Sequence, residues 1–79
     1  MKTANMEIVN QYLSALRLMI ANDDAGIQDL SNQLAADKAV SAIDMKTIAS
    51  EFAGAPKRLS KKAAWFHIQK KVRLHVINR

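Results

Sequence analysis

Apolar residues recur at helical spacing in four stretches of the chain. The first stretch covers residues 5–21, and its main apolar positions alternate at intervals of three and four residues, which is typical of one helix face. These positions are Met6, Val9, Leu13, Leu16 and Ile20, widened by Ile8, Tyr12, Ala15 and Met19. Such a wide stripe indicates either a helix central to the core or one that also contacts another chain. A homo-oligomer formed through this helix is therefore one alternative.

The second stretch, residues 25–37, has a narrower stripe formed by Ile27, Leu30 and Leu34. We expect the first helix to end with Asn22 in a left-handed conformation, and Asp23 or Asp24 to cap the second helix. The polar positions predicted to face solvent are Gln28, Asp29, Ser31, Asn32 and Gln33.

The third stretch, residues 42–53, has the clearest start and stop signals. Ser41 and Asp44 have the spacing of a capping box, in which each residue bonds the other's backbone amide. Gly54 is expected to end the helix, and Pro56 cannot continue it. The predicted core positions are Met45, Ile48, Ala49 and Phe52.

The fourth stretch, residues 61–78, follows a connector of residues 54–60. We expect Leu59 to hold this connector against the core, leaving Lys57 and Arg58 exposed, and Ser60 to cap the last helix. The predicted buried face of that helix is Ala64, Trp65, Ile68, Val72 and Val76. Phe66 falls off this face, so it is either exposed or a second core contact.

Composition agrees with an all-α fold. The 79 residues include no Cys, two Gly and one Pro, and about half of them are apolar. A turn-rich β fold needs more Gly and Pro than this. We therefore predict one compact domain of about four helices. In this arrangement the first two pack across a C-terminal pair that is joined by an extended loop.

Charge is divided unevenly along the chain. Residues 1–51 contain four cationic and seven acidic side chains, a net charge of −3, whereas residues 52–79 contain eight cationic and no acidic side chains, a net charge of +8. Such a division is typical of a surface that binds an anionic partner.

Catalytic and metal-binding patterns are lacking in the sequence. There is no thiol, no Gly-rich phosphate loop and no metal-spaced carboxylate pair, and His67 and His75 have no acidic neighbour in sequence. We interpret both histidines as surface or boundary residues, and Asp23 and Asp24 as helix-end residues. We expect no enzymatic activity, no cofactor and no metal. No stretch is apolar enough to span a membrane, and the start of the chain lacks a secretion signal, so we expect a cytoplasmic location.

Residues 41–72 resemble a SAP-type helix–extended loop–helix module. The resemblance rests on the first-helix segment from Met45 to Ala49, on the Gly54-Ala55-Pro56 loop opening, and on Lys61 or Lys62 at the entry to the second helix. Trp65, Ile68 and Val72 continue the apolar positions of that second helix. The usual glycine before the lysine is replaced by Leu59 and Ser60. The resemblance implies DNA or RNA binding through the loop and the start of the second helix.

We therefore predict a binding module that contacts the nucleic acid backbone through a C-terminal basic surface. The predicted site residues are Lys57, Arg58, Lys61, Lys62, Phe66, Lys70, Lys71 and Arg73. Phe66 could stack on a base or anchor a protein contact, whereas Trp65 is expected to pack in the core. The alternative is a small helical adaptor or inhibitor, encoded by a phage or mobile element, that docks on an acidic surface of a larger protein.

Overall fold

A computed structural model describes residues 3–77, which form successive helices joined by short loops. Within these residues there are four helices and no strand: α1 (Met6–Ala21), α2 (Ile27–Ala36), α3 (Ala42–Ala53) and α4 (Lys61–Ile77). The predicted all-α class is confirmed. The last helix was predicted to reach Asn78, which lies outside the described residues.

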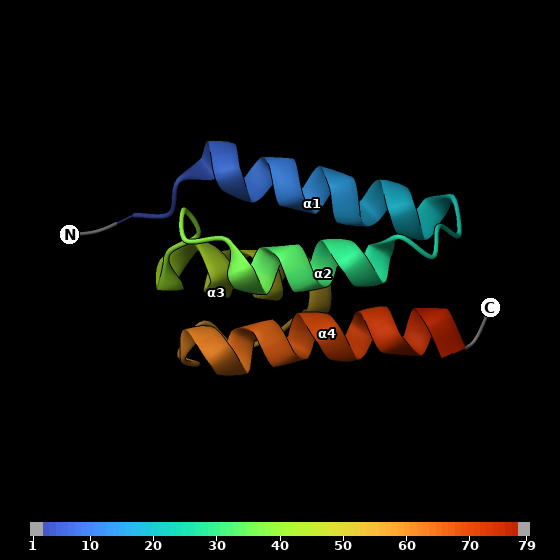
Figure 1. Cartoon of the computed structure of the whole chain (residues 1–79). Coiled ribbons are helices and arrows are strands. Elements are labelled where there is room, and N and C mark those ends of the chain that lie inside the picture. The colour runs from blue at the N-terminus through green and yellow to red at the C-terminus, as the bar shows by residue number, and fades with distance from the viewer. Residues whose placement is uncertain (1–2, 78–79) are drawn as a thin grey trace.

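The four helices surround one core. α1 packs against α3 and α2, and α4 packs against the same two helices from the other side. Figure 1 shows α1 and α4 at opposite edges of the molecule, with α2 in front of α3. The resulting body is elongated, with extents of 41 × 21 × 19 Å. α4 therefore has one long side on the core and another on the surface.

The core consists mainly of aliphatic side chains, as the shortage of aromatic residues requires. α1 contributes Val9, Tyr12, Leu13 and Leu16, and its flanking Ile8, Met19 and Ile20 also pack against the core. Burial of these side chains removes apolar surface from water and is the main force that holds the helices together. Packing within one chain thus accounts for most of the wide stripe on α1.

The start and stop signals of α3 have clear structural counterparts, whereas the predicted end of α1 is displaced by one residue. The capping box is present, with the Ser41 side chain accepting from the Asp44 amide, and Gly54 ends α3 at φ 68°. At the end of α1, however, Asn22 has φ −94°, and the left-handed residue is Asp23 at φ 52°. The prediction for Asn22 was wrong by one residue, because both residue types tolerate this conformation.

α2 differs from its prediction in its bounds and its polar face. It begins at Ile27 with Gly26 as its N-cap and no side-chain cap bond, so the predicted cap at Asp23 or Asp24 was wrong. Asp24 instead accepts a hydrogen bond from the Gly26 amide at 2.8 Å, in the turn before the helix. Ser31 was predicted to face solvent but is fully buried. Its hydroxyl donates to Gln69 Oε1 of α4 at 2.6 Å. A polar group can be buried when it is paired in this way, so hydrophobic spacing alone could not reveal the contact.

A hydrogen bond between side chains links the middle of α1 to the C-terminal end of α2. The Tyr12 hydroxyl donates to Asp37 Oδ2 at 2.6 Å. Burial of Tyr12 and its bond to Asp37 raise the pKa of Tyr12 to about 12. The same bond, together with the Ala39 amide and the nearby Lys61, lowers the pKa of Asp37. Both shifts favour the ionisation states that keep this bond intact at neutral pH.

A buried carboxylate joins the start of α1 to the start of α3. Asp44 is only 3% exposed, and its two oxygens accept from the Asn5 amide at 2.7 Å and the Ser41 amide at 3.0 Å. Burial alone would raise the pKa of Asp44, but the bonds from Ser41 and Asn5, with a contribution from Lys61, lower it overall. The ionised carboxylate is therefore part of the fold.

We expect Asp44→Asn to lower the free energy of unfolding at pH 7 by about 1–3 kcal/mol, because an amide cannot accept both bonds. The folded-state pKa of Asp44 lies below its ordinary value of 3.8. Its contribution is therefore present above that value and is lost as pH falls through the folded pKa. Urea denaturation at pH 7 and near pH 2.5 tests this.

The matched control is Glu51→Gln, which changes an exposed carboxylate on α3. It should shift the unfolding free energy by less than about 0.5 kcal/mol at either pH. An Asp44→Asn deficit of equal size at both pH values would contradict the role given to the ionised carboxylate.

Candidate functional site

The orientation of α4 is set by three small or branched apolar residues. Ala64, Ile68 and Val72 have no exposed surface, and their spacing of four residues places them along one narrow line of the helix. Trp65 and Val76 are partly buried beside this line. The predicted inner face is therefore confirmed. The opposite side of the helix is left outside the core.

Hydrogen bonds between α4 and α2 also fix the orientation of α4. The Trp65 indole Nε1 donates to the Ser31 carbonyl oxygen at 2.8 Å, and Gln69 accepts from the Ser31 hydroxyl. One residue of α2 thus holds two neighbouring turns of α4. Trp65 is held in place by this bond as well as by packing, in agreement with its predicted structural role.

Six residues on the other side of α4 form a surface that we call the outer α4 face. Its members are Lys62, Phe66, Lys70, Arg73, Leu74 and Ile77. At about 100° per residue, the first four fall within an arc of roughly 80° centred near Phe66, and the last two widen that arc to roughly 120°. Every member is exposed, including Phe66 at 53%. The structure thus settles the position of Phe66, which is exposed.

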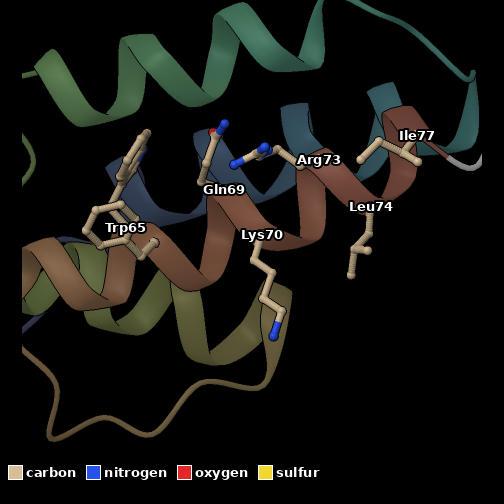
Figure 2. A pocket seen from close by; sticks show the side chains of 7 residues that line it. Trp65, Gln69, Lys70, Arg73, Leu74 and Ile77 are labelled. Atoms are coloured by element: carbon tan, nitrogen blue, oxygen red, sulfur yellow. The ribbon is translucent and has the colours of Figure 1, made fainter.

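Exposed apolar side chains are mixed with the cations on this face. Leu74 and Ile77 are 50% and 71% exposed, and sequence analysis did not select them. A shallow hollow runs along this side of the helix and is lined by residues between Trp65 and Ile77. Figure 2 shows Lys70 and Leu74 projecting to one side of α4, whereas Gln69 lies toward α2 and the Arg73 side chain lies beside Gln69.

Lys71 occupies a different side of α4 from the other predicted cations. Its ammonium group donates to the Phe52 carbonyl oxygen at 2.5 Å and lies 4.6 Å from the centre of the Phe52 ring. It therefore satisfies a carbonyl in the last turn of α3, where a positive charge is favoured. The structure assigns Lys71 a role in holding α3 to α4.

Lys61 also lies away from the outer α4 face, roughly 140° around the helix from Phe66. It is partly buried. The pKa values of Asp37 and Asp44 are lowered mainly by the hydrogen bonds that these carboxylates accept, and the positive charge of Lys61 lowers them further. The positive charge of Lys61 is therefore partly balanced by carboxylates from the N-terminal part of the chain.

The connector before α4 agrees with its prediction. Lys57 and Arg58 are exposed, Leu59 packs against the core, and the Ser60 hydroxyl accepts from the Ala63 amide at 3.2 Å. Of the eight predicted site residues, the structure therefore brings four together on the outer α4 face. Two more lie in the connector that leads to it, and the remaining two lie elsewhere on α4.

The two histidines of α4 lie outside the outer α4 face. His67 is exposed, and His75 Nε2 lies 3.3 Å from Asp23 Oδ1. Among residues 3–77 no group of His, Cys, Asp or Glu is arranged to hold a metal ion. In the same part of the chain no helix has the length and apolarity needed to span a membrane.

Comparison with known proteins gives no relative from which a function could be transferred. No protein-family model, curated protein or solved structure matches the chain. The resemblance of residues 41–72 to a SAP-type module stays a prediction.

Two neighbouring lysines provide a direct test of the division between structural and surface cations. We expect Lys71→Met to lower the unfolding free energy by about 1–3 kcal/mol, because it leaves the Phe52 carbonyl without its charged donor. Lys70→Met, one position earlier on the outer α4 face, should change it by less than about 0.5 kcal/mol. Thermal and urea unfolding measure both. Equal effects of the two substitutions would contradict the assignment.

Proposed function

We propose that the chain is a non-enzymatic module that binds the phosphate backbone of nucleic acid through the outer α4 face and the preceding connector. The observation that carries the proposal is that the exposed residues Lys62, Lys70 and Arg73 occupy positions within a narrow arc of α4 around an exposed aromatic ring. Residues 52–79 contain no acidic side chain, so no carboxylate from this segment offsets the three charges.

Phosphate binding depends on cation number and placement more than on fine geometry. Lysine and arginine side chains attract the backbone by charge and release its condensed counterions. Lys57 and Arg58 add two exposed cations immediately before α4. The resemblance to the SAP-type module supports the same class of partner, since it also assigns binding to the loop and the start of the second helix.

We expect the protein to bind a generic DNA duplex with an affinity that falls steeply between about 50 and 200 mM salt. Replacing Lys62, Lys70 and Arg73 together by Gln should reduce the slope of log affinity against log salt by about 2 to 3. Fluorescence anisotropy with a labelled duplex at several salt concentrations measures this slope.

The matched control replaces Arg17, Lys38 and Lys46 by Gln. It removes the same amount of charge from the N-terminal part of the chain, so net charge is held equal between the two variants. It should change the slope much less. Equal losses in both variants, or no binding of the wild type at 50 mM salt, would contradict the proposal.

A second candidate function is docking on an acidic protein surface, and the exposure of Leu74 and Ile77 favours it specifically. Exposed apolar side chains beside cations suit a protein interface with an apolar centre and a charged rim. A second copy of this chain is a poor partner for this face, because it would bring the same cations together. The partner in this alternative is therefore a different, acidic protein.

The docking alternative makes its own prediction. A partner captured from the source cells should remain bound after nuclease treatment, and Leu74→Gln with Ile77→Gln should release it by removing apolar contact. The control is Met6→Gln with Leu18→Gln, two apolar residues of α1 with similar exposure. Co-purification measured by mass spectrometry reports the outcome. Release by nuclease, or equal loss in the control, would contradict docking through this face.

A further inference from the structure

We infer that Phe66 is a stacking platform for an unpaired base, so that single-stranded nucleic acid is the preferred ligand of the outer α4 face. This inference rests on the proposed function and adds the class of ligand. Its starting point is the position of Phe66. The ring is 53% exposed, with a lysine one helical turn before it and another one turn after it.

The ring is supported on one side by a side chain that cannot easily move. The ring centres of Trp65 and Phe66 lie 5.5 Å apart, with an angle of 55° between the planes, a common geometry for aromatic pairs. Trp65 is itself fixed by its bond to the Ser31 carbonyl. An aromatic group that is already held in position loses little freedom when a ligand binds.

The surrounding cations suit a ligand that combines a flat base with a phosphate backbone. Lys62 and Lys70 each lie about 6 Å along the helix axis from Phe66, on opposite sides of it. Arg73 lies close to Phe66 in angular position, about two turns further along. A base resting on the ring would therefore have cations near the phosphates on both sides, which is the arrangement that single-strand binding proteins use.

Duplex nucleic acid cannot use this ring in the same way. In a duplex, the faces of each base are covered by the neighbouring base pairs, and only base edges are accessible in the grooves. In a single strand the bases can turn outward and stack on aromatic side chains. The cations serve both ligands, whereas the face of Phe66 contributes only to the single strand.

The test compares a labelled oligothymidylate of fifteen nucleotides with a fifteen-base-pair duplex, by fluorescence anisotropy at one low salt concentration. We expect Phe66→Leu to weaken binding of the single strand by at least about fivefold, because the aromatic face is lost while apolar volume is kept. Duplex binding should change by less than about twofold. Phe66→Tyr should bind the single strand about as tightly as the wild type, since it keeps the aromatic face that Phe66→Leu removes.

Leu18→Ala is the matched control, because it alters an exposed apolar side chain on α1, outside the outer α4 face, without removing an aromatic ring. It should leave both affinities within about twofold of the wild type. Since Phe66 and Leu18 are exposed, circular dichroism should show both variants folded.

The outcomes separate this inference from the proposed function. If duplex and single strand both bind and Phe66→Leu weakens them equally or not at all, the stacking platform is wrong and backbone binding stands. If neither ligand binds the wild type at low salt, both proposals are wrong. If Phe66→Leu instead releases a nuclease-resistant protein partner and neither oligonucleotide binds, the ring anchors a protein contact and the inference is overturned.

Discussion

The rotation of α4 about its own axis determines which cations the molecule presents to a partner. The fully buried line of Ala64, Ile68 and Val72 sets this rotation, because close packing leaves little room for a turned helix. Hydrogen bonds hold both flanks, from Trp65 to Ser31 on α2 and from Lys71 to Phe52 on α3. With the inner face fixed in this way, Lys62, Lys70 and Arg73 lie on the solvent side of α4.

The uneven charge of the chain has structural consequences besides the function proposed for it. In the N-terminal part, Asp44 joins two helix starts and Asp37 binds Tyr12, so these acids stabilise the fold locally. Lys61 balances part of their charge, and Lys71 caps α3. Part of the excess positive charge is therefore balanced within the fold, while Lys62, Lys70 and Arg73 are exposed within a narrow arc of α4. A concentrated set of cations attracts phosphate more effectively than the same charge spread over the molecule.

The sequence predicted much of the fold, because the signals that define it are local. The capping box of Ser41 and Asp44, the stop at Gly54 and the connector before Ser60 all act within a few residues. Contacts between distant residues were missed. Ser31 meets Gln69 across 38 positions, and the bond from Asn5 to Asp44 spans 39. Neither polar pair leaves a trace in hydrophobic periodicity.

The candidate site was predicted in part for a related reason. A count of charges includes every cation equally, whichever side of the helix the cation occupies. The helical period carried some of the missing information, because it places Lys61 and Lys71 roughly 140° from Phe66 and places Leu74 and Ile77 close to it. What the period could not provide is the carbonyl of Phe52, which gives Lys71 its partner, or the exposure of each side chain.

The most direct test of the account is a map of the bound surface. Backbone amide NMR spectra of the protein, recorded while an unlabelled oligonucleotide is added, report which residues experience the ligand. We predict that the largest shifts cluster on Lys62, Phe66, Lys70 and Arg73 and on the connector residues Lys57 and Arg58, with α1 unchanged. Shifts centred on α1, or spread evenly over all four helices of the described chain, would contradict it.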